Sequence, residues 1–159
     1  MLTLDQFHAM VDNVKRDITV GTESWLPPDI MNSEIFPSNY TVYRRDRDRS
    51  GCGVFIVVID EILSTRQRQL ETSCEMTWAR ISVVGCKDIY VCSYYRPKVD
   101  DRESLDLLFS SVDRICYSTN CHIWLAGDFN FPGINWSSKT LKHNCPSSDL
   151  HELFCKTSG

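Results

Sequence analysis

Two acidic residues lie where predicted strands end, and carboxylates in such places can bind a metal ion. Glu23 follows the apolar segment 18–22, and Asp128 stands at the exit of the apolar segment 122–126. Functional groups gather at strand ends in layered α/β proteins. Mg²⁺ binds one or two such carboxylates and leaves its other positions to water and phosphate. The same residue types form turns and helix caps, so the spacing alone leaves both interpretations open.

Three more polar side chains could act on a phosphodiester. Asn130 lies two residues beyond Asp128, so extended backbone would put both side chains on one side, where they could hold a water and a phosphate oxygen. The alternative is an Asx turn, because this stretch is rich in turn formers. Tyr95 is the last residue of the predicted strand 88–95, and Arg96 directly follows it. They offer a hydroxyl and a guanidinium fork suited to phosphate. Their alternative is an edge tyrosine and a solvated arginine.

Histidine is the side chain that most often serves as a general base, and the chain has four: His8, His122, His143 and His151. A general-base histidine needs an acidic partner to hold its tautomer. His151 and Glu152 are neighbours on a predicted helix and would point in different directions. We interpret all four histidines as structural or solvated.

The elements that must position these groups follow from hydrophobic periodicity. Apolar residues recur at helical spacing over 4–15 and about 101–117, and a last helix is expected from Ser147 to Phe154. Strands are predicted at 18–22, 40–45, 54–59, 74–84, 88–95 and 122–126. The run 54–59 is almost entirely apolar, which is typical of a strand covered on both faces. This order predicts a single layered α/β domain over residues 1–159, with a mixed sheet.

Composition restricts the class of protein. The chain has 159 residues, 42% hydrophobic and 24% charged, with a formal net charge of −4. A nucleic-acid-binding protein usually has a basic face, and the run Arg44, Arg45, Arg47 and Arg49 is interleaved with Asp46 and Asp48. We interpret this run as a solvated charged turn.

The cysteines and the absence of targeting signals bear on the compartment. Eight cysteines occur without a Cys-x-x-Cys pair, and several lie in apolar strand-like runs. Reduced thiols in a nuclear or cytoplasmic protein are therefore expected, with no membrane segment and no secretion.

Seven segments in order resemble a known family. They are Thr22-Glu23-Ser24-Trp25-Leu26, Ile35-Phe36-Pro37 through Tyr43-Arg44-Arg45-Asp46-Arg47, Gly51-Cys52-Gly53-Val54, Cys74-Glu75-Met76-Thr77-Trp78, Tyr94-Tyr95-Arg96-Pro97, Leu125-Ala126-Gly127-Asp128-Phe129-Asn130, and Pro132 to Trp136. This order resembles the endonuclease domain of jockey-like non-LTR retrotransposons. That family belongs to the exonuclease–endonuclease–phosphatase superfamily, together with apurinic endonucleases and DNase I.

The resemblance implies a fold and an activity. The fold would be a four-layer α/β sandwich of the DNase I-like type, and the activity hydrolysis of DNA phosphodiesters with Mg²⁺, or Mn²⁺ as the alternative. The nick would free a 3′ end that primes the reverse-transcriptase domain of the parent polyprotein.

By this resemblance Glu23 matches the metal-binding glutamate and Tyr95 the tyrosine that contacts the scissile phosphate. Asp128 matches the aspartate that orients or activates the attacking water, and Asn130 the asparagine that positions the phosphate. Arg96 stands at a variable position of the family and is a candidate DNA or phosphate contact.

The chain also departs from the family pattern. The family begins with a strand that carries a metal-site asparagine, and it ends with a further aspartate and a Ser-Asp-His run. Asn13 lies in a predicted helix, and Ser148-Asp149-Leu150-His151 is only a spaced variant of that run. We therefore expect an incomplete sandwich with impaired nuclease activity. The alternatives are a non-catalytic remnant that serves, if at all, as a binding module, and a phosphoinositide or sphingolipid phosphatase of the same superfamily.

Overall fold

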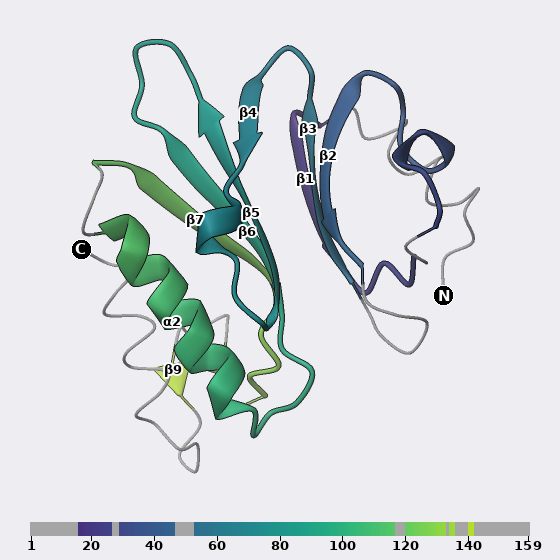
Figure 1. The fold of residues 1–159 in the computed structure, drawn as a ribbon. Coiled ribbons are helices and arrows are strands. Elements are labelled where there is room, and N and C mark those ends of the chain that lie inside the picture. The colour runs from purple at the N-terminus through teal and green to yellow at the C-terminus, as the bar shows by residue number, and fades with distance from the viewer. Residues whose placement is uncertain are drawn as a thin grey trace.

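A computed structural model gives the fold and describes residues 16–26, 29–46, 53–116, 120–132, 134–135 and 140–141. The predicted helices at 4–15 and from Ser147 lie outside the described residues. Within that part, two sheets pack face to face, and one α-helix covers the outer face of the larger sheet (Figure 1). None of the described helices is long and apolar enough to cross a membrane.

The smaller sheet contains β1 (Ile18–Thr22), β2 (Tyr40–Arg45) and β3 (Val54–Ile59) in the antiparallel order β1-β3-β2. All three strands have the predicted bounds. The central strand β3 is buried on both faces, as its apolar run predicted. Its even-numbered residues face the larger sheet and its odd-numbered residues face outward.

The larger sheet contains β4 (Leu63–Arg66), β5 (Glu75–Ser82), β6 (Ile89–Tyr95) and β7 (His122–Asp128) in that spatial order. β4, β5 and β6 are antiparallel, whereas β6 and β7 are parallel. Helix α2 (Arg102–Cys116) makes the crossover that a parallel pair needs. The sequence did not predict β4, because its four residues are mostly polar and carry no apolar pattern.

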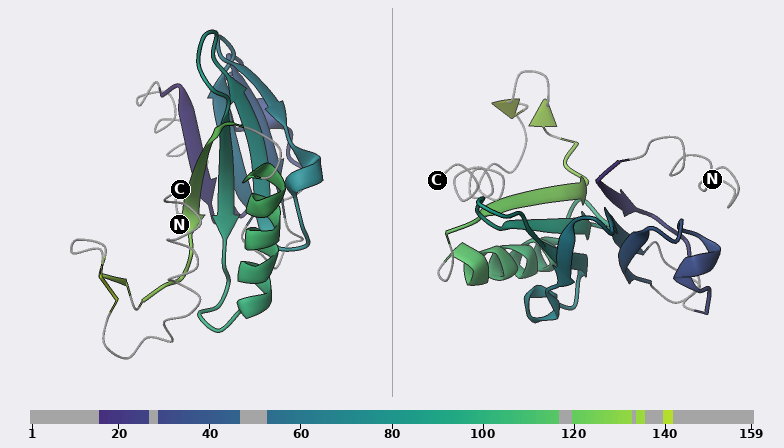
Figure 2. Two further views of the ribbon diagram at one scale, coloured as in Figure 1. Left: turned by 90° about the vertical axis from the view of Figure 1, so that its left-hand side faces the viewer. Right: turned by 90° about the horizontal axis from the view of Figure 1, so that it is seen from above.

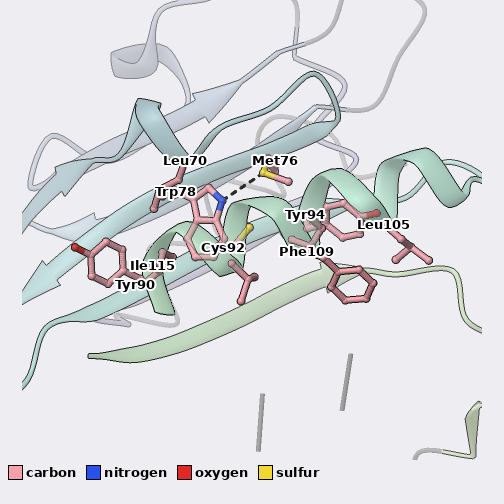
Figure 3. Close-up of a cluster of buried hydrophobic side chains, with 11 residues drawn as sticks. Leu70, Met76, Trp78, Tyr90, Cys92, Tyr94, Leu105, Phe109 and Ile115 are labelled. Carbon is pink, nitrogen blue, oxygen red and sulfur yellow. Dashed lines mark hydrogen bonds between the residues drawn. The ribbon is translucent and has the colours of Figure 1, made fainter. Parts of the chain in front are cut away.

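Helix α2 and the larger sheet enclose the main core (Figure 3). Trp78 is fully buried there, and its indole N–H donates to the Met76 sulfur at 3.3 Å. The predicted alternation along β5 is confirmed, since Met76 and Trp78 face the helix and Ala79 and Ile81 face the other sheet. The helix begins at its predicted acidic end, where Asp101 Oδ1 accepts the Ser104 N–H at 3.0 Å.

Two further clusters define the remaining layers, which Figure 2 shows from the side and from above. Ile56 and Val58 of β3 pack against Ala79 and Val91 between the sheets. On the outer face of the smaller sheet, Phe55 and Val57 are covered by Leu26 and by residues 29–36, which include the 3-10 helix η1 (Asn32–Glu34). Among the described residues, the layer outside the smaller sheet therefore consists of a loop and the short helix η1. A complete four-layer sandwich would have α-helices in this layer.

Short elements complete the described part. The 3-10 helix η2 (Arg68–Leu70) packs near α2, and its Leu70 is buried in the main core. β8 (Ile134–Asn135) and β9 (Thr140–Leu141) form a separate antiparallel pair.

Among the cysteine side chains that the structure describes, Cys74, Cys86 and Cys92 are free thiols. Cys92 is fully buried in the main core, and burial raises its pKa well above the ordinary value of a thiol. Burial also raises the pKa of Cys74, against hydrogen bonds from Thr72 and Ser104 and the charge of Arg45. The raised pKa of both thiols disfavours the thiolate, which is the nucleophilic form of cysteine.

Candidate active site

The parallel pair β6 and β7 brings two predicted site residues side by side. Tyr95 and Asp128 are the last residues of their strands and are register partners. In-register partners on parallel strands point to the same side of a sheet. Tyr95 is 8% exposed at this position, whereas Asp128 is exposed to solvent.

Strand β1 brings the third residue to the same edge. The hydroxyl of Ser93 donates to the Gly21 carbonyl oxygen at 2.9 Å and so joins the two sheets. Ser93 lies two residues before Tyr95, and Gly21 lies two residues before Glu23. Glu23 directly follows β1 and is exposed. The bond between β1 and β6 thus places Glu23 at the edge of the molecule where Tyr95 and Asp128 end their strands.

The loop after Asp128 is the Asx turn that the sequence offered as one of two interpretations. The Asn130 N–H donates to Asp128 Oδ1 at 2.9 Å, which is an Asx turn. Asn130 has a φ of 48°, so the backbone is not extended and alternation does not place its side chain beside that of Asp128. The side-chain amide instead turns back to β6 and donates to the Arg96 carbonyl oxygen.

Gly127 allows β7 to approach β6 this closely just before Asp128. Its φ is 137°, and a Cβ built on it would lie 1.9 Å from the Tyr94 carbonyl oxygen. Only glycine fits such a position without moving a strand.

Arg96 does not lie where a phosphate contact would place it, and we correct that expectation. Its side chain is buried, with 2% of the residue exposed. The guanidinium Nε donates to the Asp101 carbonyl oxygen at 3.0 Å, and Nη2 donates to the Val99 carbonyl oxygen. Its carbon Cζ lies 4.9 Å from the centre of the Phe131 ring. Arg96 therefore braces the turn after β6 from within.

Glu75 is a site candidate that sequence reasoning passed over. It begins β5 directly opposite Tyr95 in antiparallel register, so both side chains lie on one face of the sheet. Glu75, Tyr95 and Asp128 thus form a row across three strands. The sequence offered no signal, because Glu75 reads as the polar start of a strand until the pairing of β5 with β6 is known.

The prediction that the arginine run 44–49 forms a solvated turn is wrong for its first two residues, Arg44 and Arg45. Arg44 pairs with Asp46 at 2.9 Å and donates to the Ile30 carbonyl oxygen, and both paired side chains are nearly buried. Burial raises the pKa of Asp46, against the charges of Arg44 and Arg66. Arg45 donates to the Thr72 and Cys74 carbonyl oxygens, and so ties β2 to the start of β5. The rest of the run lies outside the described residues.

His122 is exposed at the start of β7, the opposite end of that strand from Asp128. The other three histidines lie outside the described residues. The described residues contain no group of three or more His, Cys, Asp or Glu side chains that could hold a metal ion by themselves. Glu23 and Asp128 offer exposed carboxylates of the type that Mg²⁺ binds, an ion that takes much of its coordination from water and substrate phosphate.

Comparison with solved structures identifies the fold as that of a retrotransposon endonuclease domain. One similar structure is the "Endonuclease domain of TRAS1, a telomere-specific non-LTR retrotransposon", with a TM-score of 0.61 and 14% sequence identity. The match covers 93% of this chain and 60% of that chain. No family model matches the sequence, and no curated protein matches it significantly. The predicted α/β fold class and the resemblance to this kind of domain are confirmed at the level of the fold.

Proposed function

We propose that this domain hydrolyses phosphodiester bonds of DNA with a divalent metal ion, as the target-site nicking endonuclease of a retroelement. The observation that carries the proposal is the register of Tyr95 beside Asp128, with Glu23 brought to the same edge by β1. The resulting group offers a phenol and two accessible carboxylates at one sheet edge. The nick would supply a 3′ hydroxyl to the reverse transcriptase of the parent element.

Each residue has a role that its surroundings support. Glu23 would hold Mg²⁺ or Mn²⁺ through an exposed carboxylate. A bound ion would offset charge that develops on the phosphodiester and lower the pKa of a coordinated water. Asp128 uses Oδ1 in the Asx turn, which leaves Oδ2 to orient the attacking water. The carboxylate is thus held in one rotamer by its own loop.

Tyr95 and Asn130 would hold the phosphate. The Tyr95 hydroxyl would donate to a non-bridging phosphate oxygen at the rim of the site. Asn130 commits one amide hydrogen to the Arg96 carbonyl, and the amide has a second hydrogen for a phosphate oxygen. Glu75, on the same face as Tyr95, would orient the phenol or add a carboxylate to the metal site.

Nicking of supercoiled plasmid by the purified chain, with Mg²⁺ or Mn²⁺ and with EDTA as the blank, tests the proposal. Asp128→Asn and Glu23→Gln should each lower the rate by about 10²-fold or more, the scale of a lost acid–base or charge-stabilising group. Tyr95→Phe should lower it by about tenfold, the scale of one hydrogen bond to a charged group. Asp106→Asn, on the exposed surface of α2, is the matched control and should nick like the wild type.

The alternative hypotheses predict different results. DNA binding without metal-dependent nicking would establish the non-catalytic binding module. Phosphate release from a phosphoinositide, with plasmid left intact, would establish the phosphatase. Nicking that persists in Asp128→Asn would refute the site itself.

A further inference from the structure

The main chain of Arg96 contacts both candidate site residues that follow the body of β7, namely Asp128 and Asn130. Its N–H donates to the Asp128 carbonyl oxygen at 2.9 Å. Its carbonyl oxygen accepts the side-chain amide of Asn130. The position of Asp128 and Asn130 relative to Tyr95 therefore depends on where the backbone of Arg96 lies.

The side chain of Arg96 fixes that backbone. Nε and Nη2 bond two carbonyl oxygens of the following turn, those of Asp101 and Val99. A planar guanidinium can bond both at once because its donors form a rigid fork, which an ammonium group lacks. Asp101 also caps α2 through Ser104, so the turn is held at both ends.

An aromatic stack secures the other face of the guanidinium. Cζ of Arg96 lies 4.9 Å from the Phe131 ring centre, and Phe131 stacks on Phe129 with centroids 6.2 Å apart and an interplanar angle of 9°. Phe129 in turn packs on Tyr94 with centroids 5.3 Å apart. Both phenylalanines flank Asn130 in the sequence. The loop that carries Asn130 is thereby held between the arginine and the main core.

The burial of this charge argues against a direct role on DNA. Nη1 is buried and makes no hydrogen bond within the described residues. A phosphate could reach the guanidinium only if the turn 97–101 opened. Burying a cation is costly, and an apolar side chain would fill the same space. The gain specific to arginine here is the fork that holds two carbonyl groups.

We propose that Arg96 is a positioning residue, which holds Asp128 and Asn130 in register with Tyr95 and does not touch the substrate. This inference rests on the proposed nuclease function. It replaces a phosphate contact with a brace, and the two roles give opposite results in the experiments below.

Salt dependence and kinetics separate the two roles. Duplex binding is measured by fluorescence anisotropy without metal between 50 and 200 mM salt, where each lost phosphate contact lowers the slope of log K against log salt by about 1. We expect Arg96→Met to keep the wild-type slope and KM within about twofold and to lose kcat by about 10²-fold, the cost of misplaced catalytic groups. Lys87→Gln, which removes an exposed charge in the turn before β6, is the control for net charge.

The conservative variant sharpens the distinction. Lysine keeps the charge and binds phosphate well but cannot span both carbonyl groups. We expect Arg96→Lys to lose kcat as Arg96→Met does. A slope that falls by about 1 in Arg96→Met, together with wild-type kcat in Arg96→Lys, would overturn the proposal.

A milder variant covers the case in which substitution of Arg96 prevents folding. Phe131→Leu removes the stack and leaves the hydrogen bonds. The main-chain N–H groups of Arg96 and Asn130 both donate to Asp128. Their hydrogen exchange should then be at least about tenfold faster than in the wild type. Unchanged exchange would refute the brace. This readout needs no nicking, so it remains decisive even if the wild type proves inactive and the proposed function fails.

Discussion

Substitution of Gly127 by alanine should separate the strands that form the site. Gly127 has a φ of 137°, a region that residues other than glycine occupy at a cost of about 1–3 kcal/mol. The new Cβ would also lie 1.9 Å from the Tyr94 carbonyl oxygen and 2.9 Å from the Tyr94 carbonyl carbon and nitrogen. These are backbone atoms of a central strand, so relief requires β6 and β7 to move apart, which costs about 1–3 kcal/mol more.

The two contributions add to roughly 2–6 kcal/mol, out of a total near 5–15 kcal/mol for a domain of this size. At about 2–4 °C per kcal/mol, the melting temperature should fall by roughly 5–20 °C. Thermal and urea unfolding followed by circular dichroism measure the loss. Nicking assayed well below the melting temperature should also fall, because the displaced residue precedes Asp128.

Gly85→Ala is the matched control. Gly85 has a φ of 78°, and no atom lies within 4 Å of its built Cβ. That variant should lose only the conformational part, about 1–2 kcal/mol, and keep its nicking rate. Equal losses of unfolding free energy in the two variants would refute the reasoning, because they would show that close approach to Tyr94 contributes nothing.

Three other predictions concern the bonds and burial around the site. Ser93→Ala removes the hydrogen bond between the sheets, so it should lower the free energy of unfolding in urea by about 1–2 kcal/mol and also lower the nicking rate. Ser82 is a partly exposed serine at the far end of β5, and Ser82→Ala should keep the wild-type nicking rate. Burial raises the pKa of Tyr94 above its ordinary value of 10. As the pH rises, the phenol therefore loses its proton in the unfolded chain before it does so in the folded one. The unfolding free energy should hold below about pH 10 and fall above it, and it should fall less steeply in Tyr94→Phe. Cys86 is exposed and Cys92 fully buried, so peptide mapping after brief maleimide treatment should find Cys86 modified and Cys92 intact, and equal labelling would contradict the core assignment.

Much of the fold could be predicted from the sequence, because apolar periodicity reports burial directly. The strands 18–22, 40–45 and 54–59 appear with their predicted bounds, and α2 is within one residue of its prediction at each end. The bounds of β5 were predicted too wide, since turn residues at both ends share its alternation. β4 was missed because a short polar edge strand is defined by its partner and not by its own residues.

The site could be predicted only in part, because residue type does not give direction. Tyr95 and Asp128 could be placed at strand ends, and parallel pairing then set them side by side. Arg96 has the residue type of a phosphate ligand, but its side chain points into the turn, where carbonyl groups hold it. Glu75 became a candidate only when the register of β5 was known. Long-range pairing, which no local pattern encodes, decided these cases.

Backbone strain at the candidate site supports a functional role for this edge. Among the described residues, three other than glycine have positive φ, namely Glu23 at 56°, Trp25 at 52° and Asn130 at 48°. Two follow β1 and one follows β7, so all three lie at or within two residues of Glu23 and Asp128, the carboxylates proposed to hold metal and water. Left-handed backbone costs about 1–2 kcal/mol per residue for most side chains and less for asparagine. The fold does use glycine where contact requires it, at Gly127 and at Gly53, whose carbonyl oxygen accepts the Ser24 N–H. Glycine would also be cheaper at residues 23 and 25, and a carboxylate and a half-exposed indole stand there instead. The proposed function accounts for the carboxylate at residue 23, because a glycine there would be less strained but could not hold a metal ion.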